Sequence, residues 1–337
     1  MGTLIFKAGQ KTQSIRPSCY FRNNKRHLKL YTKIKYPAVV KLVVLCCILF
    51  AGNTLKAAEE FISGPVTSTQ AEAIAYLNKI TNLKSSAHWP NIKPEMFLEN
   101  LKTNVHKPLS IYPGKATNFC GYGALTYLFL QDDPLGYATL LMQLYLDGKA
   151  TFHSTTFDPS PAIKEQAGQL KYKGILDINP AEQMWYLTLA DHYKGYLNFF
   201  NRKYDPGDEN KFWASVNYAK FNRMARNLLH YKGTAWGGDL MRPKGADLYT
   251  YISEKMKDGI VVLFINNRIV HKKDHIQLKL GVPTHFIVAE KISMENDMIT
   301  FIYWDYGRKT QLQMSAAFFK RIVFGISQFT KKEADAK

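Results

Sequence analysis

The pattern of apolar residues changes in the last third of the chain, and this change limits the folds that the chain can adopt. Residues 259–265 form a continuous apolar run rich in Ile and Val, which predicts a buried strand. Residues 285–289 and 298–305 predict two further strands, and the Asn-Asp pair at 296–297 is typical of a hairpin turn between them. Helical patterns precede these strands instead of alternating with them. This order predicts an α+β fold with an antiparallel sheet and argues against a doubly wound parallel sheet.

The earlier part of the chain is expected to be helical, with loops rich in proline between the helices. Read from apolar spacing and helix-start residues, the predicted helices cover 66–105, 121–130, 137–146, 181–200, 211–230 and 245–257. The predicted organisation is a leader at 1–58, a helical segment at 59–110, a main domain at 111–330 with a helical insertion at about 152–244, and a charged tail at 331–337. The sequence leaves open whether residues 59–110 act as a pro-segment over an active-site cleft.

Basic residues are concentrated near the N-terminus. The chain has 45 Lys and Arg against 27 Asp and Glu, but 11 of the basic residues and none of the acidic ones lie in residues 1–58. The remaining residues therefore carry a modest excess of 34 basic over 27 acidic side chains. They contain no stripe of Lys and Arg interleaved with aromatic residues, so we do not expect a nucleic-acid partner.

The leader has the pattern of a secretory signal peptide. Residues 42–51 form an uncharged apolar run between Lys41 and the small residues Ala57 and Ala58. This run is shorter than the roughly 20 residues that span a bilayer. We therefore expect an exported protein, periplasmic or secreted, that is cut near Ala58 and meets the membrane only through its leader. The alternatives are an anchor that stays uncleaved and a buried strand or helix; a start of translation near Val40 would explain the long basic stretch upstream.

Only one of the four cysteines lies outside the leader. Cys19, Cys46 and Cys47 fall within residues 1–58, so an exported mature chain keeps Cys120 alone. A single thiol has no partner for an intramolecular disulfide. Cys120 is therefore a packed side chain, an intermolecular link or a reactive group.

Cys120 stands where a loop rich in Pro and Gly meets the apolar helix predicted at 121–130. A thiol at the N-terminus of a helix lies at the positive end of the helix dipole, which favours the thiolate. The N–H groups at that end can hold an oxyanion as it forms, and Gly121 lets a substrate approach the backbone. A nucleophilic cysteine needs this placement, although a structural cysteine can also occupy it.

The strands offer a base for this thiol and a group to orient the base. His285 is the first residue of one predicted strand, and Asp305 is the last residue of the next. The hairpin would bring the two side chains together, so that Asp305 fixes the tautomer and orientation of the His285 ring. The predicted roles are nucleophile for Cys120, general base and acid for His285, and orienting group for Asp305.

These residues, in this order, resemble the papain-like cysteine peptidases, and most of all the branch called C39-like peptidases. The resemblance rests on Cys120-Gly121 heading a helix, on the apolar run at 259–265, and on His285 and Asp305 in the strands that follow. It covers residues 111–310 in the order of elements. It implies a papain-like α+β fold, with the Cys-headed central helix packed on the antiparallel sheet. It also implies a Cys-His-Asp triad that cleaves peptide or isopeptide bonds through an acyl-enzyme.

Two departures from the family pattern bear on activity. The family has a glutamine several residues before the cysteine, which completes the oxyanion hole, whereas Gly114 stands at about that place. Either Asn118 or another side chain substitutes for the glutamine, or the site is weakened. The family aspartate is often followed by proline, whereas Tyr306 follows here. The alternative function is therefore a catalytically inactive papain-like module that binds a partner in the cell envelope.

We expect neither a metal nor a cofactor. His271 and His275 stand four residues apart, but no Cys or Glu nearby completes a zinc site. The sequence contains no glycine-rich phosphate loop and no dinucleotide fingerprint. The expected substrate is a protein, a peptide or a peptidoglycan peptide, and the same groups can pass the acyl group to an amine. A third alternative is a structural envelope protein held by an uncleaved leader.

Overall fold

A computed structural model of the chain describes residues 66–114, 117–169, 178–245, 247–267 and 281–331. These residues all belong to one compact unit, Ala58–Lys337. The predicted leader with its signal peptide and the histidines at 271 and 275 lie outside the described residues, as does most of the predicted tail. No helix within the described ranges is both long and apolar enough to cross a membrane.

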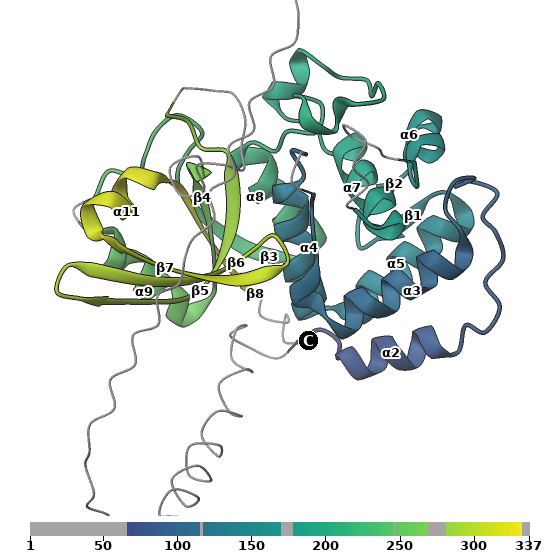
Figure 1. The fold of residues 1–337 in the computed structure, drawn as a ribbon, viewed down its shortest axis with the longest axis horizontal. Helices are drawn as coiled ribbons and strands as arrows, with labels where there is room; N and C mark the ends of the chain where they lie inside the picture. Colours follow the sequence, from purple (N-terminus) through teal and green to yellow (C-terminus); the bar gives the residue numbers. More distant parts are fainter. Residues whose placement is uncertain (1–65, 115–116, 170–177, 246, 268–280, 332–337) are drawn as a thin grey trace, which may run out of the picture. The chain divides into compact units, whose positions relative to one another are not determined.

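The architecture is α+β, with most helices first and an antiparallel sheet in the C-terminal part (Figure 1). The six strands lie in the order β3-β8-β4-β5-β6-β7, and every neighbouring pair is antiparallel. In chain order they are β3 (Tyr231–Gly237), β4 (Ile260–Ile265), β5 (His285–Glu295), β6 (Met298–Asp305), β7 (Arg308–Ser315) and β8 (Val323–Lys331). A small separate sheet pairs β1 (Ala150–Phe152) with β2 (Thr155–Phe157).

Four of the helices begin with a proline. At this position the fixed φ of proline suits the helix, and its missing N–H removes no helical hydrogen bond. The helices are α2 (Gln70–Asn78), α3 (Pro94–His106), α4 (Cys120–Asp132), α5 (Pro134–Asp147), α6 (Pro161–Gln166), α7 (Pro180–His192), α8 (Tyr218–Leu228), α9 (Leu248–Asp258) and α11 (Ala316–Ile322). Three 3₁₀ turns accompany them: η1 (Pro108–Ser110), η2 (Tyr196–Phe199) and η3 (Asp208–Asn210).

Helix α4 lies between the sheet and helices α5 and α7 (Figure 1). It contacts β5, α5, α7 and α8. Residues 121–130 are buried without exception, because the helix is apolar all round and is covered on every side. The residue that begins this helix, Cys120, is consequently held at a fixed place beside the sheet.

Strand β4 explains why the sequence has a continuous apolar run at 260–265. Ile260, Val262 and Phe264 pack in the core shared with α4 and α8. The alternate residues of β4 pack in a second core with α9 and α11 on the opposite face of the sheet. A strand buried on both faces needs apolar residues at every position instead of at every second one.

The segment predicted as a helical insertion at 152–244 is not wholly helical. It contains the β1–β2 hairpin and ends in β3, which pairs with β8 at the edge of the main sheet. Most residues of β3 are exposed or half-buried, so this edge strand has no apolar run in the sequence. The helices predicted at 181–200 and 211–230 are also shorter: α7 ends at His192, and α8 begins only after Asn217, whose side chain caps it.

The segment predicted at 59–110 belongs to the same core as the main domain. Helix α2 packs on α3 and α5, and α3 packs on α7. Ala73, Leu77, Phe97 and Leu101 are fully buried in the cluster that also contains the apolar residues of α4. The described part of this segment is therefore built into the fold, which argues against a removable pro-segment.

Candidate active site

Cys120 is the first residue of α4, and its thiol is free and half-buried. The preceding residue, Phe119, supplies no side-chain cap, so the N–H groups of the first turn keep their positive field toward this end. The Sγ atom lies 3.7 Å from the carbonyl oxygen of Thr284, the residue before β5. The helix thus places its thiol at the start of the strand that begins with His285.

His285 and Asp305 are joined by a hydrogen bond. The Nε2 atom of His285 lies 2.5 Å from Oδ1 of Asp305. The two residues are 1% and 3% exposed, so water hardly competes for this contact. Strands β5 and β6 pair in the hairpin predicted from the sequence, and their antiparallel register brings the first residue of β5 near the last residue of β6.

Cys120 completes a series of three side chains. Burial by itself lowers the pKa of His285, but the charge of Asp305 and the hydrogen bond to it act in the opposite direction. Hydrogen bonding to Cys120 and its charge add to this effect, and the pKa of His285 rises above its ordinary value of 6.5. Because Nε2 is bonded to Asp305, Nδ1 is the ring nitrogen that can serve the thiol. The imidazole therefore stands between a thiol and a carboxylate and favours its charged form.

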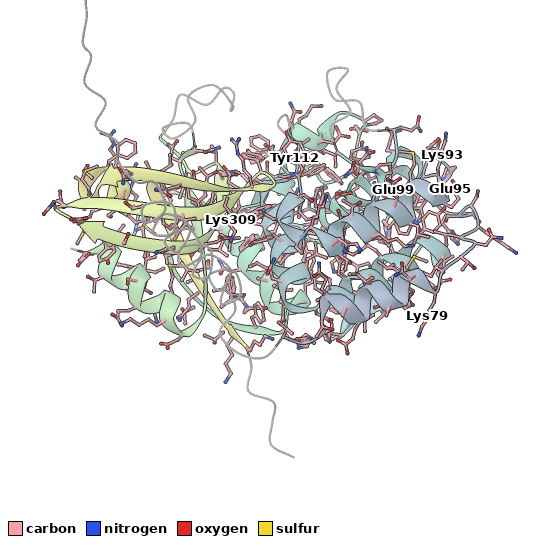
Figure 2. The ribbon with its side chains drawn as sticks, turned by 60° about the horizontal axis from the view of Figure 1, so that its bottom comes forward. Lys79, Lys93, Glu95, Glu99, Tyr112 and Lys309 are labelled. Carbon is pink, nitrogen blue, oxygen red and sulfur yellow. The ribbon has the colours of Figure 1, made fainter. Side chains whose placement is uncertain are left out.

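Tyr306 covers the imidazole. Its ring stacks on that of His285 with centroids 4.6 Å apart and planes 14° apart, and it also contacts the ring of Tyr112. Figure 2 shows Tyr112 at the junction of the helices and the sheet. Tyr306 and Gly307 form the two-residue turn between β6 and β7, with φ of 43° and 77°. A left-handed tyrosine is uncommon, and the stacking of its ring on His285 had no signal in the sequence.

The amide of Asn118 bonds the loop before α8. Its Nδ2 donates hydrogen bonds to the carbonyl oxygen of Lys211 and to Oγ of Ser215, at 3.0 and 3.1 Å. These two bonds hold residues 211–215 against the start of α4. The role of Asn118 as an oxyanion donor stays a prediction, which the observed hydrogen bonds of its amide do not favour.

Gly114 is buried and has a φ of 85°, a conformation that glycine adopts at little cost. This position therefore offers no side-chain donor. The backbone N–H groups of Cys120 and Gly121, in the first turn of α4, can act as hydrogen-bond donors there. A Cβ at Gly121 would lie 2.9 Å from Val216, so this glycine lets the loop before α8 pack against the start of α4.

A buried lysine behind the site was missed from the sequence. Lys220 is 1% exposed, and its Nζ donates to Oη of Tyr122 at 2.7 Å and to the carbonyl oxygen of Ser215 at 3.1 Å. Burial first, and then the charges of Lys194 and Arg223, lower the pKa of Lys220 well below its ordinary value. The residue ties α8 to α4 and to the loop that Asn118 holds. A lysine in an otherwise ordinary amphipathic helix gives no sequence signal for this role.

The described residues contain no group of three or more His, Cys, Asp or Glu side chains placed to hold a metal ion. Comparisons with protein-family models, curated proteins and solved structures found no match to this chain. The chemistry of the site therefore has to be argued from its own geometry.

Proposed function

We propose that the chain is a thiol hydrolase of the papain-like type, which cleaves amide bonds through an acyl-enzyme on Cys120. One observation carries the proposal: a buried imidazole stands between the only free thiol of the described residues and a carboxylate. The order of a Cys-headed helix, a His-headed strand and a strand ending in Asp supports it. The substrate would be a protein, a peptide or a peptidoglycan peptide.

In the first half of the reaction, the Cys120 thiolate attacks the carbonyl carbon of the substrate and forms the S–C bond. The carbonyl electrons move to oxygen, where the N–H groups at the start of α4 stabilise the negative charge. The imidazolium of His285 then gives its proton to the amide nitrogen, and the C–N bond breaks. The amine leaves, and a thioester remains on Cys120.

In the second half, His285 is neutral and takes a proton from water as the water attacks the thioester. The C–S bond breaks, the acid leaves, and the thiolate–imidazolium pair returns. Asp305 keeps the ring oriented throughout and stabilises its charged form. An amine in place of water would make the same site an acyltransferase.

The test is the rate at which Cys120 is alkylated at pH 7, followed by mass spectrometry so that the three leader cysteines are counted separately. We expect His285→Ala to slow this alkylation by about tenfold, because the imidazole no longer takes the proton of the thiol. His106→Ala, at an exposed position on α3, is the matched control and should change nothing. An alkylation rate that His285→Ala leaves unchanged would contradict the proposal.

The alternative is an inactive papain-like module that binds a partner. Its support is the absence of a side-chain oxyanion donor at Gly114 and the engagement of the Asn118 amide with the neighbouring loop. Incubation with activated peptide esters separates the two functions, because only the hydrolase forms a Cys120 thioester that is seen by intact-mass measurement and is lost in Cys120→Ser.

Export is part of the same proposal and rests on the sequence of residues 1–58 alone. The mature protein would begin near Glu59 and act in the periplasm or outside the cell. Mass spectrometry of the N-terminus in the natural host checks this. A full-length N-terminus in the mature protein would instead favour a leader that stays in place as an anchor.

A further inference from the structure

The most exposed apolar side chains of the described residues gather on two loops. Leu240, Phe200, Phe199 and Met241 are 78, 75, 71 and 70% exposed, the highest values among the large apolar residues of the described part. Phe200 contacts both Phe199 and Phe212 through their rings. We call the whole set the apolar rim: Tyr196, Phe199, Phe200, Phe212, Leu240 and Met241.

The two loops of the apolar rim are joined to each other and to the candidate active site. The side chain of Tyr196 in the first loop lies close enough to Asp239, the residue before Leu240 in the second loop, for the charge of Asp239 to raise the pKa of Tyr196 after burial has done so. Phe212 follows Lys211, whose carbonyl oxygen accepts the bond from Asn118, two residues before Cys120. Figure 1 shows the loop after α7 beside the N-terminal end of α4. The apolar rim is therefore attached to the edge of the site.

Basic side chains surround the apolar rim. Arg202, Lys203, Arg242 and Lys244 are exposed in the same two loops. A hollow of ≈ 590 Å³ opens at Met241. Its lining, which we call the basic hollow, has three cationic side chains and no acidic one: Met241, Arg242, Pro243, Lys244, Gly245 and Lys320.

The acids of these loops offset this charge only in part. Asp208 and Glu209 are buried, and Asp239 accepts a hydrogen bond from the backbone N–H of Tyr218. Asp205 and Asp247 are the exposed acids of the described part of the two loops, against the four exposed cations Arg202, Lys203, Arg242 and Lys244. The face therefore combines protruding apolar side chains with a net positive surface.

We propose that the apolar rim docks on an anionic lipid surface and that the basic hollow receives a phosphate headgroup. Apolar side chains that protrude among cations suit the boundary between headgroups and acyl chains. The hollow on this face is lined by three cationic side chains, which suits a phosphate group better than an apolar side chain of a peptide. Docking in this orientation brings the start of α4 close to the membrane surface. The proposal does not depend on whether Cys120 is a nucleophile.

Tryptophan substitution tests which face meets the lipid, in the full chain, so that the leader is the same in every variant. Phe200→Trp is compared with Met298→Trp, an exposed apolar position on β6. The probe is a vesicle of brominated phosphatidylglycerol and phosphatidylcholine, since bromine quenches only nearby indoles. We expect quenching and a blue shift of the added tryptophan in Phe200→Trp alone. Equal quenching in both variants, or none in Phe200→Trp, overturns the proposal.

A second test measures partition of the full chain onto the same lipids without bromine. Phe199→Ser with Phe200→Ser should weaken partition at least about tenfold. The double variant Lys203→Gln with Lys244→Gln should partition more weakly onto vesicles that contain phosphatidylglycerol, by about fivefold for each charge removed. Its binding to vesicles of pure phosphatidylcholine should be unchanged. If Phe199→Ser with Phe200→Ser leaves partition unchanged, lipid docking is overturned. If this variant in addition loses turnover of soluble peptides, the apolar rim is a peptide-binding surface instead.

Discussion

At the scale of single residues, the site depends on how His285 is held. Its ring is bonded to Asp305, stacked by Tyr306 and linked to Cys120, and almost none of it meets water. A buried imidazole left alone would stay neutral, because burial disfavours its charge. Here the neighbouring carboxylate reverses this preference. The charge state of His285 is therefore a property of its neighbours.

Replacing Asp305 by Asn tests that statement. The amide keeps the volume but loses the charge that raises the pKa of His285, so this pKa should fall toward its ordinary value of 6.5 or below, because burial then disfavours the charged ring. In wild type the stability from the His285–Asp305 pair is fully present below pH 6.5 and is lost as the pH rises through the raised folded pKa. NMR of the ring should show an imidazolium that does not titrate between about pH 5 and 8 in wild type and does titrate in Asp305→Asn. Asp297→Asn, in an exposed turn, is the control; a His285 signal that titrates near 6.5 in wild type would be the contrary result.

At the scale of elements, the position of Cys120 depends on the contact between α4 and the loop before α8. Gly121 lies against Val216, the amide of Asn118 bonds this loop, and Lys220 ties it to Tyr122. These contacts join segments about 95 residues apart in the chain. The loop and the start of α4 should therefore move together.

Gly121→Ala is expected to disturb this contact. In a helix the change to alanine usually stabilises by about 0.5–1 kcal/mol, but here the added Cβ meets Val216 at 2.9 Å. We expect a net loss of about 1–3 kcal/mol in the free energy of unfolding, measured by chemical denaturation. Val216→Ala should restore most of the loss in the double variant. If Gly121→Ala alone stabilises the protein, the close contact is not part of the fold in solution.

At the scale of the whole molecule, the helical core contains a carboxyl group that the site does not use. Glu182 in α7 is 2% exposed; its Oε1 accepts a hydrogen bond from Asn179, and its Oε2 has no partner. Burial raises the pKa of Glu182 from 4.5 to about 7, against the lowering effect of its hydrogen bonds. The buried carboxyl group of Glu182 is therefore partly protonated near neutral pH.

Glu182→Gln tests the consequence for stability. An acid with a raised folded pKa stabilises the fold least when it is ionised, so stability should fall as the pH rises from 4.5 through 7 and level off above. The decrease expected from this group is roughly 3 kcal/mol, and the glutamine variant should lack it. Thermal unfolding at several pH values measures the difference. Glu99→Gln, exposed on α3 and labelled in Figure 2, should keep the wild-type pH profile. If Glu182→Gln also keeps that profile, the pKa of Glu182 is not raised in the folded protein.

The sequence by itself was sufficient for the fold class, the β5–β6 hairpin, the strand at β4 and the helix headed by Cys120. Each of these has a local pattern, because a strand buried on both faces is apolar throughout and an Asn-Asp turn adopts positive φ. It also predicted that His285 and Asp305 lie together, since a hairpin joins the ends of neighbouring strands.

Tertiary structure alone decided the rest. Edge strand β3 takes its conformation from pairing with β8 and shows no apolar run, and the segment before α8 is held by side chains from α4. Tyr306 stacks on His285, Asn118 is occupied by the neighbouring loop, and Lys220 is buried, because segments far apart in the chain meet there. Local patterns record which face of an element is apolar. They do not indicate which distant polar group will lie opposite that face. At this site, such distant groups set the charge of His285 and the position of Cys120.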